Sequence, residues 1–198
     1  ISLTIQDNEF FVLIGSSGCG KTTLLKTLNK LNPIDKGEIL INGTPINRIK
    51  VTQLPRLMGY VVQEGGLFPH MTVEDNIALA MRVAGYPKKK IYDRITELLE
   101  LVNLEPDQYR SQYPSQLSGG QRQRIGVARA FAADPEIILM DEPFSALDPM
   151  TRAELQDEVH RLQLRFHKTI VFVTHDMDEA VKLADRICIL QNGHVVQC

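Results

Sequence analysis

The residues with the most definite chemistry form a glycine-rich stretch at positions 15–22, which fits G-x-x-x-x-G-K-[ST] at every position. Glycines let backbone N–H groups approach phosphate oxygens, and a following helix adds its positive end. Lys21 offers a cation to the β- and γ-phosphates, and the Thr22 hydroxyl can ligate Mg²⁺. The alternative is a glycine turn with a solvated lysine. The predicted phosphate-binding residues are Gly15, Ser16, Ser17, Gly18, Cys19, Gly20, Lys21, Thr22 and, near the α-phosphate, Thr23.

Two adjacent carboxylates form a second candidate site at the end of an apolar run, residues 137–140. A buried strand there would place Asp141 at the carboxyl edge of a sheet, beside the phosphate loop, residues 15–22. Asp141 can hold Mg²⁺ through its water shell, and Glu142 can accept a proton from an attacking water. An ordinary helix cap at Glu142 and Pro143 is the alternative.

Two polar residues follow other predicted strands. Gln63 ends a strand over 58–62, and its amide can reach a metal or a water molecule. His175 ends a strand over Thr169–Thr174. Taken alone, a solvated glutamine and a structural histidine remain open for these positions.

A second glycine motif, residues 117–121, opens a predicted helix that carries Arg122, Arg124 and Arg129. Ser118 is a good N-cap, and the glycines after it expose backbone N–H groups. The motif therefore predicts a second anion site 23 residues before Asp141. A capped helix with a basic face is the alternative.

The elements that position these residues alternate between strand and helix, which predicts a mainly parallel sheet with helices on both faces. Apolar patterns indicate strands over 1–5, Phe10–Ile14, 38–41, 58–62, 137–140, Thr169–Thr174 and a hairpin over 186–196. Periodicity and caps indicate helices over 21–29, Val73–Val83, from Pro87 past Val102, 119–132, Pro149–Phe166 and 177–184. Residues from about 70 to 134 are all helical. We therefore expect one α/β domain over 1–198, with a core of 1–69 and 135–198, an inserted helical subdomain, and truncation at both ends.

Composition narrows the class of protein. The 198 residues are 43% hydrophobic and 23% charged, as in an ordinary globular domain. The net charge of −2 gives no basic field for nucleic acid, and the apolar runs are too short for a membrane span. Cys19, Cys188 and Cys198 are an odd, widely spaced set, which favours free thiols in a reducing compartment. Cys19 is either a reactive thiol or a small tolerated loop residue.

Taken together, these motifs resemble those of the ATP-binding cassette (ABC) ATPases over essentially the whole chain. The matches, in family order, are 15–22, Gln63, 117–121, Asp141 with Glu142, 145–148 and His175. The resemblance implies a P-loop NTPase core with an antiparallel β edge and an inserted α-helical subdomain. It also implies ATP with Mg²⁺, and a head-to-tail dimer in which the phosphate loop of one copy and residues 117–121 of the other enclose each ATP.

The resemblance also implies roles for single residues. Glu142, His175 and Gln63 form the catalytic set, and Mg²⁺ is held by Thr22, Gln63 and Asp141. In the partner's ATP site, Ser118, Gly119, Gly120 and Gln121 are the contacts. Asp148 crosses the interface. The family also stacks an aromatic residue on adenine about 25 residues before the loop, but only 14 residues precede Gly15.

A closer likeness lies in residues 66–73, 113–117 and 134–148, which look like the importer ATPases for quaternary-amine osmoprotectants such as glycine betaine, carnitine and choline. It implies solute uptake at the cytoplasmic face of a bacterial membrane, with transmembrane permease subunits and, indirectly, a solute-binding protein. Residues 68–71 would then form a socket for a permease helix, or simply pack into the core.

Other functions stay open. They are an importer ATPase for another small solute such as an amino acid, a non-transport ABC ATPase, and a P-loop enzyme working alone. Only 54 residues, without sustained heptads, separate Gln63 from Ser118, which argues against the coiled-coil DNA-repair members. The near-neutral charge argues against a nucleic-acid partner.

Overall fold

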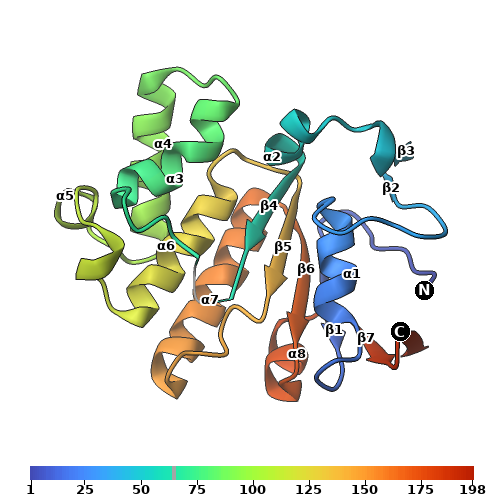
Figure 1. Ribbon diagram of the computed structural model, residues 1–198. Coiled ribbons are helices and arrows are strands. Elements are labelled where there is room, and N and C mark those ends of the chain that lie inside the picture. The colour runs from blue at the N-terminus through green and yellow to red at the C-terminus, as the bar shows by residue number, and fades with distance from the viewer. Residues whose placement is uncertain (64–65) are drawn as a thin grey trace.

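The computed structural model describes residues 1–63 and 66–198, in which a six-stranded sheet has the order β4-β5-β6-β1-β7-β8 (Figure 1). The neighbours from β4 to β7 pair in parallel, and β8 pairs antiparallel with β7 at one edge. The predicted α/β class, with its mainly parallel sheet and antiparallel edge, is thus confirmed. The strands are β1 (Phe10–Ile14), β4 (Met58–Val61), β5 (Ile137–Asp141), β6 (Thr169–Thr174), β7 (Arg186–Gln191) and β8 (His194–Gln197).

The central strand β1 is apolar throughout because both faces of the sheet are covered. Phe10, Val12 and Ile14 belong to one hydrophobic cluster, whereas Phe11 and Leu13 belong to another. This alternation follows from the two-residue period of a strand. The first cluster is closed by helices α6 (Gly119–Phe131), α7 (Pro149–Phe166) and α8 (Met177–Leu183), and the second by α1 (Lys21–Leu28). The sheet therefore forms the middle of three layers.

Between β4 and β5 the described chain is helical, with α3 (Val73–Val83), α4 (Lys88–Leu101), the short α5 (Pro106–Tyr109), the 3₁₀ helix η3 (Pro114–Gln116) and α6. The Thr72 hydroxyl accepts a hydrogen bond from the Asp75 N–H and so caps α3, as expected of an N-cap residue. In Figure 1 these helices lie beside the β4 edge of the sheet, away from α1. The division of the domain at residues 70 and 134 stays a prediction.

Two sequence-based predictions need correction. Residues 1–5 form no strand, although Leu3 and Ile5 pack on the second cluster, because no described strand pairs with this segment. The strand expected at 38–41 is reduced to β2 (Leu40–Ile41), which turns into β3 (Thr44–Pro45) as a separate two-stranded sheet.

The sequence analysis also missed several short elements: η1 (Ile46–Arg48), η2 (Val51–Gln53) and α2 (Leu54–Leu57). Elements of three or four residues are too short for a periodic pattern. In the part of the chain that the structure describes, no helix combines the length and the apolar character needed to cross a membrane.

Candidate nucleotide site

The phosphate loop joins the carboxyl end of β1 to the first turn of α1. Gly18 and Gly20 have φ of 78° and 105°, in the left-handed region, and a Cβ at either position would meet nothing within 4 Å. Gly20 is also the N-cap of α1, and no side chain caps that end. The glycines therefore permit the left-handed backbone of the loop, and the N-terminus of α1, which no side chain caps, can donate backbone hydrogen bonds to an anion.

Lys21 is held inside this loop. Its side chain is buried, and its Nζ donates to the carbonyl oxygens of Gly15 at 2.7 Å and Ser16 at 3.1 Å. Cys19 Sγ lies 3.9 Å from the same nitrogen. The ammonium group thus lies inside the loop and pairs with neutral carbonyl oxygens, which do not cancel its charge.

Thr22 connects the loop to the end of β5. Its hydroxyl donates to Asp141 Oδ1 at 2.8 Å, and the Tyr60 hydroxyl lies 3.4 Å from Asp141 Oδ2. Asp141 is a buried carboxylate. The burial of Tyr60, and then the negative charge of Asp141, raise the pKa of Tyr60 to about 12. A serine or threonine hydroxyl beside a carboxylate is a set of hard oxygen ligands, which fits Mg²⁺.

The predicted magnesium set is brought together only in part. Gln63 is exposed, and its Nε2 contacts Ser145 Oγ at 3.3 Å rather than Asp141. Within residues 1–63 and 66–198, no group of three or more His, Cys, Asp or Glu side chains could hold a metal ion. Any Mg²⁺ bound by Thr22 and Asp141 would therefore need further oxygens, such as those of phosphates and water.

Glu142 and His175 meet at the same edge. His175 Nδ1 lies 3.1 Å from Glu142 Oε2, so that the two predicted catalytic side chains are in hydrogen-bond contact. Glu142 has a φ of 44°. The left-handed region is costly for a residue with a side chain, and such conformations persist where the surroundings fix them. Here the Glu142 N–H donates to the Val173 carbonyl at 3.0 Å, which fixes the turn after β5.

The second glycine motif lies on a different part of the molecule. In Figure 1, α6 begins beside the other insert helices, well away from α1 and the phosphate loop. Ser118 Oγ accepts from the Gln121 N–H at 3.2 Å, and Gln121 Oε1 accepts from the Ser118 N–H at 2.8 Å. This reciprocal capping box leaves Ser118 and Gly119 exposed.

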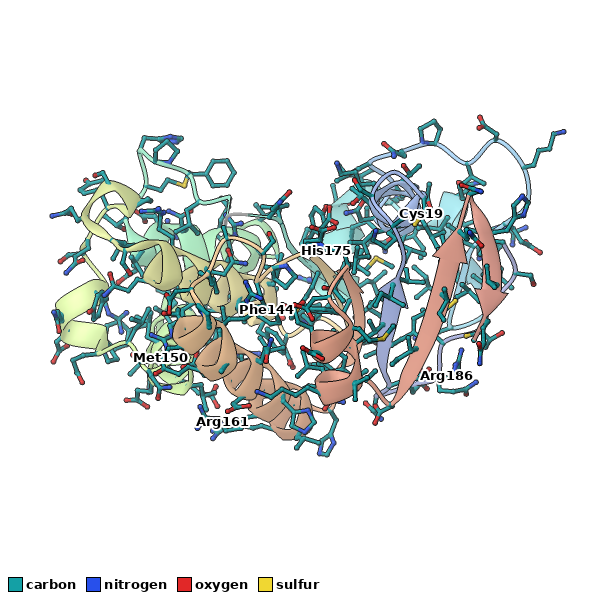
Figure 2. The ribbon with its side chains drawn as sticks, turned by 90° about the horizontal axis from the view of Figure 1, so that it is seen from below. Cys19, Phe144, Met150, Arg161, His175 and Arg186 are labelled. Carbon is teal, nitrogen blue, oxygen red and sulfur yellow. The ribbon has the colours of Figure 1, made fainter. Side chains whose placement is uncertain are left out.

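Asp148 caps the next long helix. Its Oδ1 accepts from the Thr151 N–H at 3.1 Å, and hydrogen bonds, first of all from Thr151, lower the pKa of this exposed carboxyl. A Cβ added at Gly120 would lie 2.6 Å from Thr151 Cγ2. The second glycine motif therefore contacts the first turn of α7, which Asp148 caps. Sequence spacing alone does not reveal this contact. Figure 2 shows the molecule from below. Met150 at the start of α7 lies on the left, His175 lies nearer the middle, and Cys19 of the phosphate loop lies to the right of His175.

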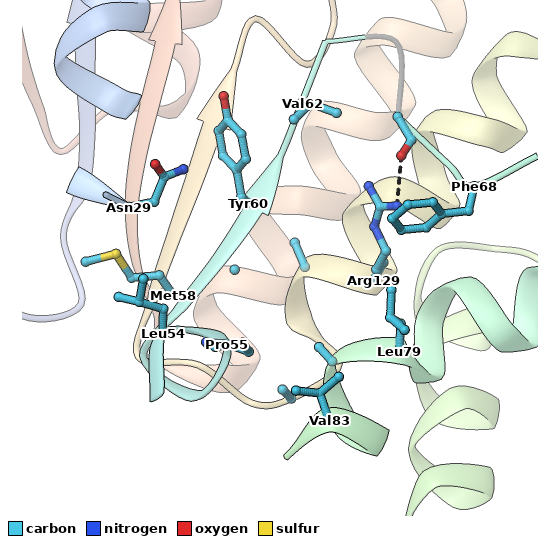
Figure 3. Close-up of a pocket in the computed structure, with 15 residues that line it drawn as sticks. Asn29, Leu54, Pro55, Met58, Tyr60, Val62, Phe68, Leu79, Val83 and Arg129 are labelled. Atoms are coloured by element: carbon cyan, nitrogen blue, oxygen red, sulfur yellow. Dashed lines mark hydrogen bonds between the residues drawn. The ribbon is translucent and has the colours of Figure 1, made fainter. Parts of the chain in front are cut away.

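The structure also shows an apolar cavity of about 450 Å³ beside β4 (Figure 3). Its walls come from α2, β4, α3 and α6, and Phe68 and Arg129 lie at one end. Burial lowers the pKa of Arg129, whose Nη1 donates to the Gly66 carbonyl at 2.9 Å. Of the cavity residues, sequence reasoning selected Phe68 alone as a socket residue, because the others face one another only after folding.

A glycine-rich loop between a strand and a helix, with a carboxylate beside its threonine, is typical of P-loop nucleotide-binding proteins. The model of the ABC transporter family matches residues 1–145, and the chain belongs to that family. The structure is similar to the dimeric structure of the ABC transporter cassette MJ0796, with a TM-score of 0.88 and 33% identity over 98% of this chain and 86% of that one. A structure of MJ0796 in a post-hydrolysis state, bound to ADP and Pi, has a TM-score of 0.87 over the same shares, at 33% identity.

Curated relatives match the whole chain. It is 54% identical to the glycine betaine/carnitine/choline transport ATP-binding protein OpuCA of Bacillus subtilis, over 100% of this chain and 52% of that protein. It is also 54% identical to the choline transport ATP-binding protein OpuBA of the same species, over 51% of that protein. The glycine betaine uptake system ATP-binding protein YehX of Escherichia coli is 50% identical, with 64% of its length covered. The chain thus spans about half the length of most of these relatives.

Proposed function

We propose that this chain is the ATP-hydrolysing module of a bacterial ABC importer for a quaternary-amine osmoprotectant such as glycine betaine, carnitine or choline. The observation that carries the proposal is one sheet edge that gathers the phosphate loop, Asp141, Glu142 and His175. The names of the 54%-identical relatives, which are transport ATP-binding proteins for these solutes, support the solute class.

Phosphate binding comes from the loop and Lys21. The backbone N–H groups of residues 15–23 surround the phosphates, and Lys21 neutralises the charge that develops on the leaving and transferred groups. Mg²⁺, when bound to Thr22, Asp141 and Gln63, would shield the phosphate oxygens. Asp141 fixes the Thr22 hydroxyl at 2.8 Å, so the metal-binding edge is already ordered by the fold.

Water activation falls to Glu142. Its carboxylate accepts the proton of the attacking water, which leaves the oxygen able to attack the γ-phosphorus while ADP departs. His175, 3.1 Å away, orients Glu142 and reaches the γ-phosphate. The left-handed backbone at Glu142 is fixed by the hydrogen bond from its N–H to the Val173 carbonyl, which holds this residue at the end of β5.

The second half of each ATP site comes from a partner copy. Ser118, Gly119, Gly120 and Gln121 would contact the γ-phosphate bound by the partner, and Asp148 would cross the interface beside them. The exposure of Ser118, Gly119 and Asp148 and the distance of this motif from the loop of the same chain favour this arrangement, as does the dimeric cassette MJ0796. The cavity in Figure 3 is apolar and borders Gly66 and Phe68, just after Gln63, so it suits a short helix of a permease subunit.

The test is transport by the full-length protein, assembled with its permease and solute-binding protein in sealed vesicles with ATP inside. Labelled glycine betaine, carnitine and choline should accumulate, and an excess of amino acids should not compete. Uptake of an amino acid alone would replace the proposed solute class. ATP hydrolysis by the assembled complex with no accumulation of any solute would instead favour a non-transport ABC ATPase.

A further inference from the structure

Arg152, which is not among the predicted site residues, contacts two turns of the site. One is the turn at residues 145–148, the Asp148 turn, and the other is the turn at residues 174–176, the His175 turn. Arg152 lies in the first turn of α7, and its Nη2 donates to the Leu147 carbonyl at 3.1 Å. Leu147 immediately precedes Asp148. Arg152 Nη1 lies 3.5 Å from Asp176 Oδ2, and Asp176 immediately follows His175. A single guanidinium thus joins the Asp148 turn to the His175 turn.

The third nitrogen of this guanidinium points to the same region. Arg152 Nε is buried, makes no hydrogen bond within the described residues, and lies 4.0 Å from Glu179 Oε1. The other oxygen of Glu179 accepts from the Thr174 hydroxyl at 2.6 Å. Thr174 immediately precedes His175, so the residues on either side of the histidine are both linked to Arg152, one directly and one through Glu179.

Asp176 divides its two oxygens between two tasks. Oδ1 accepts from the N–H groups of Asp178 at 2.9 Å and Glu179 at 3.3 Å and so caps α8. Oδ2 is the oxygen that faces Arg152. Asp176 therefore connects the start of α8 and the residue after His175 to the guanidinium, whose planar shape holds its donors in a fixed fork.

We propose that Arg152 is a positioning residue, which transmits the position of the Asp148 turn to His175 and so couples the partner-facing surface to the catalytic edge. The proposal rests on the proposed ATPase function. A partner copy that presses on the Asp148 turn shifts the Leu147 carbonyl, and the guanidinium carries that shift to Asp176. ATP binding by the phosphate loop does not depend on this connection, because Arg152 contacts none of residues 15–23 in any hydrogen bond or ion pair that the described residues show.

The experiment compares Arg152→Gln and Arg152→Lys with Arg165→Gln in the full-length protein. Arg165 lies in the last turn of the same helix and pairs with Glu97 at 2.8 Å rather than with either turn, so it is a matched control for losing one ion pair of α7. We expect Arg152→Gln to lower kcat for ATP hydrolysis about two- to thirty-fold, the range for residues that couple sites. The Kd for ATP should stay within about twofold of wild type, and Arg152→Lys should recover only part of kcat, because one ammonium cannot replace the fork.

A second variant separates coupling from folding. Asp176→Asn keeps a helix cap but removes the charge that faces Arg152. In a double-mutant cycle, Arg152→Gln should cost less than about twofold in kcat once Asp176→Asn is present. Additive losses, an equal loss in Arg165→Gln, or an ATP Kd that rises as much as kcat falls would overturn the proposal. If wild type itself hydrolyses no ATP, the proposed function fails instead.

Discussion

The phosphate loop and the start of α6 are both glycine-rich, and we propose that both bind phosphate, yet the fold supports them in opposite ways. The loop is tied to distant parts of the chain: Thr22 bonds Asp141, 119 residues away, and Lys21 is 5% exposed. At the start of α6, Ser118 and Gln121 bond each other across three residues, and Ser118 is exposed. The first site is tied together by a long-range hydrogen bond, whereas the capping hydrogen bonds of the second are local to its own helix end.

The difference indicates which part of the proposed ATP site can act alone. The core half is the phosphate loop with Asp141, Glu142 and His175, and the insert half is the start of α6. A site built from long-range contacts is ordered whenever the domain is folded, so the core half should bind nucleotide in a single copy. A helix end that is exposed and locally capped presents backbone donors outward, where another molecule can reach them. Changes in the core half should therefore alter chemistry, and changes in the insert half should alter stability and association.

The largest effect is expected for Glu142→Gln in the full-length protein. Loss of a general base costs about 10²- to 10⁴-fold in kcat, while ATP binding is retained because the loop is untouched. Steady-state phosphate release at saturating ATP measures the first, and equilibrium ATP titration measures the second. Glu136→Gln is the matched control, since Glu136 directly precedes the same strand at its opposite end. Equal rates in the two variants would remove Glu142 from the chemistry.

In the insert half, Gly120→Ala should lower the free energy of unfolding, because it disturbs the packing of α6 against α7. The added Cβ would lie 2.6 Å from Thr151 Cγ2, so either the Thr151 side chain must rotate or the first turn of α7 must shift. Overpacking of this kind costs about 1–3 kcal/mol in the free energy of unfolding. Gly119→Ala is the comparison, because its Cβ would meet only Arg122 Nη2, at 3.9 Å. Urea unfolding of both variants would contradict the close packing if Gly120→Ala were no less stable than Gly119→Ala.

Ser118→Ala should have a smaller effect on stability but a specific effect on association. Loss of an N-cap hydroxyl costs about 1 kcal/mol, and Thr72→Ala removes the equivalent cap of α3. The two variants should lose similar stability. Only Ser118→Ala should also weaken ATP-dependent dimerisation, measured by light scattering in the Glu142→Gln background. Equal dimerisation of both variants would mean that Ser118 serves its own helix alone.

The two halves also differed in how far sequence could predict them. The strands that carry the core half are continuous apolar runs, so the positions of Asp141, Glu142 and His175 at one edge followed from the parallel sheet. The contact of Gly120 with Thr151 and the fork of Arg152 were not foreseen, because no local pattern records how α6 packs beside α7. Gln63 was expected beside the metal ligands, but in the structure its amide contacts Ser145, since a side chain on an exposed turn has several partners within reach.

The smallest expected effect is electrostatic and belongs to the core half. Burial, and then the charge of Asp141, raise the pKa of Tyr60 to about 12, whereas tyrosine in an unfolded chain titrates near 10. Between these pH values the folded protein keeps a proton that the unfolded chain has released. The free energy of unfolding must therefore fall as pH rises through this window.

Tyr60→Phe has no such proton, so its stability should fall less steeply than that of wild type. Urea unfolding at pH 8, 10 and 11 measures the difference between the two proteins. At pH 8 the variant loses only the contact of 3.4 Å to Asp141, and the gap between the proteins should narrow or reverse as pH rises. Parallel curves would contradict the raised pKa of Tyr60, and with it the burial of Tyr60 and its contact with Asp141, and the contrast with the exposed start of α6 would weaken accordingly.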